Sequence, residues 1–115
     1  MKNSDDKHPI CGYVIKADAD VVDVQLLDLN VKDILLGDGF NLVDANDLFR
    51  MNVANNLSKS KIFEKLKSYN IAFSGGKEWS PAEVFENLVA QGHLSSGYKK
   101  IIWKDPSTYK IVDVI

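Results

Sequence analysis

This sequence has few residues of the kinds that carry disulfides, metal sites or catalysis. Among 115 residues there are one cysteine, two histidines, three prolines and a single arginine. One cysteine cannot form an internal disulfide, so we expect a reduced, cytoplasmic protein. No stretch approaches ~18 consecutive apolar residues, and we therefore expect no membrane-spanning helix. The first nine residues are polar and lack the apolar segment of a secretory signal.

The residues that are present are those of an ordinary globular protein. Hydrophobic residues make up 45% of the chain and charged residues 26%, with a formal net charge of −2. This balance argues against disorder, and the length suits one domain of ~100–150 residues. We predict a polar tail over residues 1–9 and a single α+β domain over residues 10–115. It would contain an N-terminal strand pair, about three helices and a C-terminal antiparallel hairpin.

Alternating and β-branched segments predict the strands. Residues 12–17 form one candidate, and the alternation of Val22, Val24 and Leu26 with polar residues predicts a second. A helix over residues 21–29 remains an alternative. Residues 71–73 form a short candidate strand, and residues 98–104 and 109–115 form a hairpin around an Asp105-Pro106 turn.

Capping residues predict the helices. Ser80, Pro81 and Glu83 form a capping box before a helix that Gly92 would end. Asn30 and Gly37 bracket a shorter helix. Two further helices are expected. The first would begin at Asp44 as its N-cap and carry an apolar stripe of Leu48, Phe49, Val53 and Leu57. The second would be capped by Ser58 or Ser60 and would bury a face of Ile62, Phe63 and Leu66.

The candidate catalytic and metal-binding groups are sparse. His8 and Cys11 are three residues apart, but zinc needs two more ligands and no second pair exists. The paired aspartates lack the spacing of a calcium loop. His93 follows a helix C-terminus, where an imidazolium is favoured by the helix dipole. The sequence therefore predicts no metal, no cofactor and no enzyme.

One glycine-rich loop keeps an enzymatic alternative open. Residues Ser74 to Lys77 match only the Gly-Lys end of a phosphate-binding loop, and Glu78 stands where serine or threonine is needed. A turn is the preferred interpretation. Binding of a phosphorylated ligand by this loop is the third hypothesis for function.

The charges are unevenly divided along the chain. Residues 1–57 carry ten acidic and five basic residues, and residues 58–115 carry six acidic and nine basic ones, giving −5 and +3. Single-sign surfaces attract partners of opposite charge. Our leading hypothesis is a non-enzymatic protein-binding module of the inhibitor, immunity or accessory-subunit type. Its Asp-rich face would bind a cationic partner through Asp18, Asp20, Asp23 and Asp38.

The basic second half suggests nucleic-acid binding as the alternative. A capped helix followed by a lysine-bearing hairpin resembles the last helix and wing of a winged-helix protein. In that resemblance the phosphate contacts would come from Lys99, Lys100, Lys104 and Lys110, with Trp103 and Tyr109 between them. Glu83 and Glu86 on the helix oppose it, as does the scarcity of arginine.

The C-terminal strand raises the question of self-association. The segment from Ile111 to Ile115 is apolar apart from Asp113, and exposed edges of this kind pair readily. We expect that a homodimer could form through this strand. The thirteen lysines and nine asparagines also suggest an AT-rich bacterial or phage-like genome.

Overall fold

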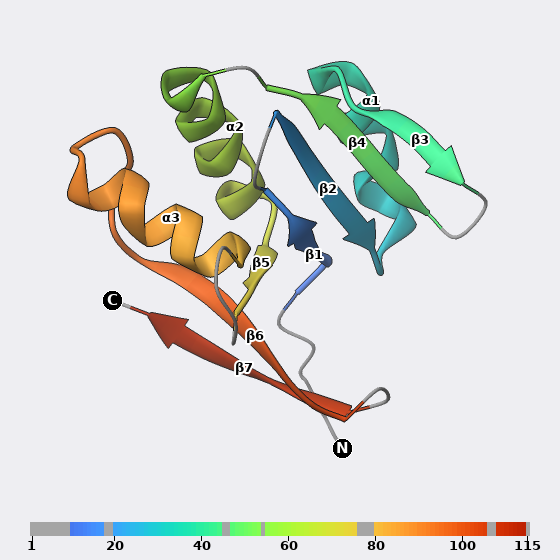
Figure 1. The fold of residues 1–115 in the computed structure, drawn as a ribbon. Helices are drawn as coiled ribbons and strands as arrows, with labels where there is room; N and C mark the ends of the chain where they lie inside the picture. Colours follow the sequence, from blue (N-terminus) through green and yellow to red (C-terminus); the bar gives the residue numbers. More distant parts are fainter. Residues whose placement is uncertain are drawn as a thin grey trace.

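Strands dominate the fold, which we describe from a computed structural model covering residues 10–17, 20–44, 47–53, 55–75, 80–105 and 108–114. Within these residues there are seven strands, three α-helices and one short 3₁₀ helix, η1 (Figure 1). The elements follow in the order β1 (Gly12–Lys16), β2 (Val21–Leu26), η1 (Leu29–Val31), α1 (Lys32–Asp38), β3 (Asn41–Asp44), β4 (Leu48–Asn52), α2 (Asn56–Ser68), β5 (Ile71–Ser74), α3 (Pro81–Ala90), β6 (Tyr98–Asp105) and β7 (Thr108–Val114). This is the expected α+β domain.

All seven strands belong to one mixed sheet in the order β3-β4-β2-β1-β5-β6-β7. β5 pairs in parallel with β1 and with β6, and the other neighbours are antiparallel. The helix α3 connects β5 to the adjacent parallel strand β6, as a crossover connection requires. The edges of the sheet are therefore β3 and β7.

The helices cover one face of this sheet. Buried side chains of α1, α2 and α3, such as Leu35, Phe63 and Phe85, share one core with Val14 and Phe73 of the strands. Strand side chains alternate between faces, so the intervening residues Tyr13 and Ala72 point to the other face. Those two residues indeed belong to a separate, smaller cluster with Ile10 and Ile101. We call this second side of the sheet the open face.

Aromatic rings form the centre of the helix-covered core. The ring of Phe73 lies 4.8 Å from that of Phe63 and 4.8 Å from that of Phe85, between centroids. Tyr98 stacks on Phe85 at 4.2 Å. These rings join β5, α2, α3 and β6, so this packing fixes both crossover helices on the sheet.

Several predictions are confirmed. The strand pair, the short strand at residues 71–73 and the C-terminal hairpin all form, and residues 21–26 are a strand, not a helix. The backbone N–H of Glu83 donates to Ser80 Oγ at 3.4 Å, as a capping box requires. Gly92 adopts a φ of +81° after α3, and the N–H of His93 donates to the Leu88 carbonyl at 3.0 Å. These contacts are those of a Schellman cap.

The helix predicted to begin at Asp44 is wrong. Residues 41–44 and 48–52 instead form the antiparallel strands β3 and β4, and β4 pairs with β2 over five residues. Phe49 is buried by this pairing, whereas Leu57 lies in α2 and is 57% exposed. The apolar spacing fits a helix locally, but pairing with β2 stabilises the extended form.

The predicted helix boundaries nearby are also corrected. α2 is capped by Asn55, whose Oδ1 accepts from the Ser58 N–H at 2.8 Å, and neither Ser58 nor Ser60 is the cap. Asp28, not Asn30, caps η1, and α1 passes through Gly37 and ends at Gly39, where φ is +106°. A left-handed φ favours glycine, which explains why Gly39 is the stop.

Candidate binding surface

Three aromatic side chains form a row on the open face. The ring of Tyr13 on β1 lies 5.6 Å from that of Trp103 on β6, and Trp103 lies 5.0 Å from Tyr109 on β7, between centroids. Both contacts are edge-on, with interplanar angles of 68° and 69°. Such contacts hold large side chains in fixed positions. We call these three residues the aromatic row.

The strand β5 lies between β1 and β6 beneath the open-face cluster. Ala72 of β5 pairs with Tyr13, and its small side chain is fully buried beneath its larger neighbours. Burial, with a smaller contribution from Tyr109, raises the pKa of the Tyr13 phenol. Trp103 itself is 38% exposed, so the row presents an aromatic surface to solvent.

A half-buried ion pair lies on the same face at β2 and β4. Arg50 Nε and Nη2 donate to the two carboxylate oxygens of Asp23 at 2.7 and 2.9 Å. The Arg50 side chain is 44% exposed, whereas that of Asp23 is only 5% exposed. The two-point contact fixes the guanidinium plane and raises the Arg50 pKa. Asp23 therefore orients an exposed arginine.

The four predicted aspartates are not grouped by the fold. Asp18 lies outside the described residues, and Asp20 is exposed in the turn between β1 and β2. Asp23 pairs with Arg50 on the open face. Asp38 ends α1 on the helix side, where it accepts hydrogen bonds from Tyr69 Oη at 2.6 Å and Lys65 Nζ at 3.2 Å. Asp23 and Asp38 thus lie on opposite sides of the sheet, and each has partners within the chain.

The four predicted lysines divide between the two sides of the β6–β7 hairpin. Lys99 shares the open face with Ile101 and donates to Asp113 Oδ1 at 3.0 Å. Lys100 lies on the helix side, 3.8 Å from Glu86 Oε2. Lys104 and Lys110 are exposed. The two lysines nearest the hairpin turn are therefore the most accessible of the four.

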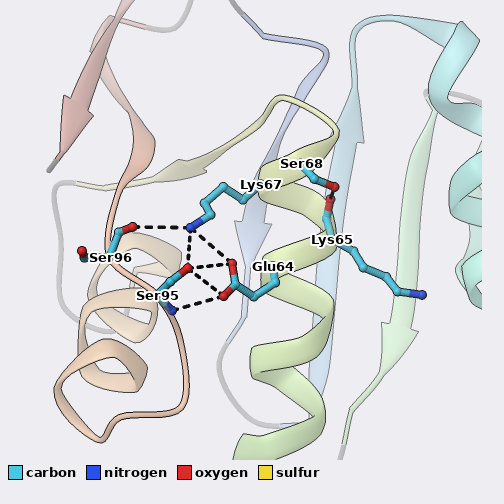
Figure 2. A network of polar contacts seen from close by, with 6 residues as sticks. All are labelled: Glu64, Lys65, Lys67, Ser68, Ser95 and Ser96. Carbon is cyan, nitrogen blue, oxygen red and sulfur yellow. Dashed lines mark hydrogen bonds and ion pairs between the residues drawn. The ribbon is translucent and has the colours of Figure 1, made fainter.

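A polar network joins α2 to the loop before β6 on the helix side (Figure 2). Glu64 accepts hydrogen bonds from the N–H and the hydroxyl of Ser95, and Lys67 Nζ lies 3.2 Å from Glu64 and 2.9 Å from Ser95 Oγ. Burial alone would raise the pKa of Glu64, but the contacts from Ser95 and Lys67 together lower it. Glu64, Lys67 and Ser95 thus contact one another, and these contacts hold the loop before β6 against α2.

Two adjoining clefts lie at the start of β6. They measure about 310 and 290 Å³ and share Gly97, Tyr98 and Val114. The Tyr98 hydroxyl donates to Glu86 on α3, and burial followed by this hydrogen bond raises the Tyr98 pKa. Lys67, Lys99 and Asp113 line the larger cleft, and Lys99 already pairs with Asp113. Lys67 contacts Glu64 and Ser95, so these three charged side chains already have partners within the chain.

The remaining candidate residues occupy structural positions. Cys11 Sγ donates weakly to Asp28 Oδ2 at 3.7 Å, and burial followed by the Asp28 charge raises the thiol pKa. His93 belongs to the Schellman cap of α3. His8 and residues 76–77 of the glycine loop lie outside the described residues. Over the described part of the chain, no three of the His, Cys, Asp and Glu side chains are grouped as a metal site would require.

The sequence pointed to part of this surface. The resemblance to a winged-helix hairpin includes Trp103 and Tyr109, but no pattern in the sequence marks Tyr13 or Arg50 as a site residue. No local pattern shows that only β5 separates β1 from β6 in the sheet, because β1 pairs with β5 about sixty residues later in the chain and β5 pairs with β6 about thirty residues after that.

Comparisons of the chain with protein-family models, with curated proteins and with solved structures find no match. Among the described residues, no helix is both long enough and apolar enough to cross a membrane.

Proposed function

We propose that this chain is a non-enzymatic protein-binding module of the inhibitor, immunity or accessory-subunit type. The aromatic row on the open face, with Arg50 on the same face, is the observation that supports it. Tryptophan, tyrosine and arginine carry most of the binding energy in protein interfaces. The aromatic row is held by ring contacts and Arg50 by Asp23, so little conformational entropy is lost on binding.

This proposal changes the role of the aspartates. Asp23 positions Arg50 and does not meet the partner directly, while Asp20 remains exposed at the β1–β2 turn. The acidic N-terminal half then accelerates encounter with a cationic partner, and the aromatic row supplies the affinity. We retain the cytoplasm as the expected location, because Cys11 has no cysteine in the chain with which to pair.

A comparison of two exposed apolar residues tests the proposal. The full chain, immobilised, is used at low salt to recover stoichiometric partners, beside Trp103→Ala and Leu57→Ala. Leu57 is the matched control, because it is exposed on α2 away from the open face. With the purified partner, Trp103→Ala should raise the Kd about 30-fold, equivalent to ~2 kcal/mol, and Leu57→Ala should leave it unchanged.

Two outcomes would contradict this function. Equal recovery of the partner by Trp103→Ala and by the unaltered chain would show that the aromatic row is not the contact surface. Failure to recover any stoichiometric protein at low salt would remove the basis for a protein-binding module.

Nucleic-acid binding by the β6–β7 hairpin is the second candidate, and the exposed side chains of Trp103, Lys104 and Lys110 on these two strands support it. Aromatic side chains stack on unpaired bases, and lysines neutralise phosphates. A gel shift with a 15-nucleotide single strand at 50 mM salt tests it. Lys104→Ala with Lys110→Ala should then lower the slope of log affinity against log salt by about two. Absence of any shift would eliminate this candidate.

A further inference from the structure

The two edges of the sheet differ in their ability to accept another strand. β3 has four residues, and a bulge between Leu42 and Asp44 interrupts its pairing with β4. β7 has seven residues, and its register with β6 is regular from Val114 to Tyr109. Short or bulged edges resist strand addition, whereas long regular edges favour it. The edge formed by β7 is therefore the one open to pairing.

We propose that β7 pairs with β7 of a second copy of this chain, antiparallel, about a two-fold axis at Ile111. A two-fold axis perpendicular to the sheet keeps each face on its own side. Residues facing each other must therefore both be odd-numbered or both be even-numbered. The residue that lies on the two-fold axis then sets the register of the two β7 strands. This inference is independent of the proposed partner surface, because it uses the strand edge.

Charge repulsion excludes two residues near the centre of β7 as the position of the two-fold axis. An axis at Lys110 places two ammonium groups directly opposite each other, and an axis at Asp113 does the same with two carboxylates. Like charges in directly facing positions destabilise a strand pair. Ile111 and Val112 are then the two central residues of β7 at which the axis can lie.

The axis at Ile111 gives the longer and better matched pairing. Because Ile111 is the central residue of Thr108–Val114, all seven residues find a partner, whereas an axis at Val112 pairs only five. On the open face Tyr109 then faces Asp113 of the second copy, and Ile111 faces itself. Asp113 already contacts Lys99 at 3.0 Å, so a tyrosine hydroxyl, a carboxylate and an ammonium group form one polar row across the interface.

The hydrophobic contacts also continue across this axis. Ile111 and Tyr109 pack on the open-face cluster that contains Ile101 and Ala72. A second Ile111 placed against the first would join the two clusters. The dimer would form one continuous fourteen-stranded sheet, with the two aromatic rows on the same face.

Disulfide trapping tests both the dimer and its register. Cysteines are placed singly at 109, 111, 112 and 113 of the full chain carrying Cys11→Ser, and the proteins are oxidised with copper-phenanthroline. Only Ile111→Cys should cross-link to itself, because facing Cα atoms on the axis are ~4.5–5.5 Å apart, within disulfide range. Copies of residue 109 would be four positions apart, or ~13 Å. A mixture of Tyr109→Cys and Asp113→Cys should cross-link.

Light scattering after size exclusion supplies the second readout. The unaltered chain should have twice its 12.8 kDa mass at about 100 μM, and Ile111→Lys should raise the dimer dissociation constant at least tenfold. Lys110→Glu is the control, because Lys110 faces Val112 and not a charge. A monomeric unaltered chain would overturn the proposal. So would selective trapping at position 112, or a dimer that traps none of the four cysteines.

Discussion

The two faces of the sheet use aromatic residues in different ways. On the helix side Phe63, Phe73 and Phe85 are fully buried, and each ring contacts the other two. On the open face Trp103 remains partly exposed and contacts its neighbours only edge-on. The first arrangement stabilises the fold, and the second leaves aromatic surface for a partner. Substitutions on the two faces should therefore separate stability from binding.

Truncation of one ring on each face gives the largest expected difference. Phe73→Ala should lower the free energy of unfolding by ~3–5 kcal/mol, because it leaves a cavity between β5, α2 and α3. Trp103→Ala removes a larger side chain but should lower the free energy of unfolding by less than ~1.5 kcal/mol, since the Trp103 side chain is already partly exposed to water. Urea denaturation monitored by circular dichroism measures both. Equal costs would show that Trp103 is a core residue and would undermine the distinction between the faces.

Substitutions in the Asp23–Arg50 ion pair test whether residues of the open face also contribute to the stability of the fold. Arg50→Ala should be the more destabilising of the two single substitutions, because it leaves the buried Asp23 carboxylate without its partner. Asp23→Asn leaves only a half-exposed guanidinium that water can solvate, so it should cost about 1 kcal/mol. Urea unfolding of both variants and of the double variant gives the coupling energy. A larger cost for Asp23→Asn than for Arg50→Ala would contradict the burial asymmetry on which this prediction rests.

The sequence predicted the helices and strands whose signals lie within a few neighbouring residues. The capping box and Gly92 located α3, and alternation located β2, because these signals act within a few residues. The β3–β4 hairpin was missed because the spacing of Leu48 and Phe49 fits a helix equally well, and only pairing with β2 excludes it. Tyr13 could not be placed beside Trp103, since no local feature encodes the parallel neighbours of β5.

The close approach of β1 and β2 provides a smaller test on the helix side. A Cβ at Gly12 would lie 2.6 Å from the Gln25 carbonyl oxygen, whereas one at Gly75 would lie 2.7 Å from Cδ of the flexible Lys100 side chain and at an ordinary contact distance of 3.4 Å from Ala82 Cβ. Gly12→Ala should therefore cost ~1–3 kcal/mol, because the backbone of β2 must move. Gly75→Ala should cost less than ~0.5 kcal/mol. Urea midpoints compare them, and equal losses would show that β1 and β2 can separate freely.

The smallest expected effect depends on pH and concerns the helix side alone. The hydrogen bond from Tyr69 to Asp38, then burial and the Asp38 charge, raise the Tyr69 pKa from 10.0 to about 12. A raised pKa means that the folded state favours the protonated phenol. The resulting stabilisation is complete below pH 10 and is lost as the pH rises towards 12. Tyr69→Phe should cost about 1 kcal/mol at pH 7, and this difference should shrink between pH 10 and 12.

Urea midpoints at pH 7, 10 and 11.5 measure this change, and Tyr109→Phe is the matched control on the open face. The Tyr69→Phe chain should approach the stability of the unaltered chain at the highest pH, because above pH 10 the unfolded state gains stability by ionising Tyr69, which the folded state keeps protonated up to about pH 12. Tyr98 also has a raised pKa and is present in all three chains, so its ionisation cancels from the comparison. A Tyr69→Phe difference that stays constant from pH 7 to 11.5 would mean that the hydroxyl contributes through packing. α1 would then be held to α2 by Leu35 and the core, without the Asp38 hydrogen bonds.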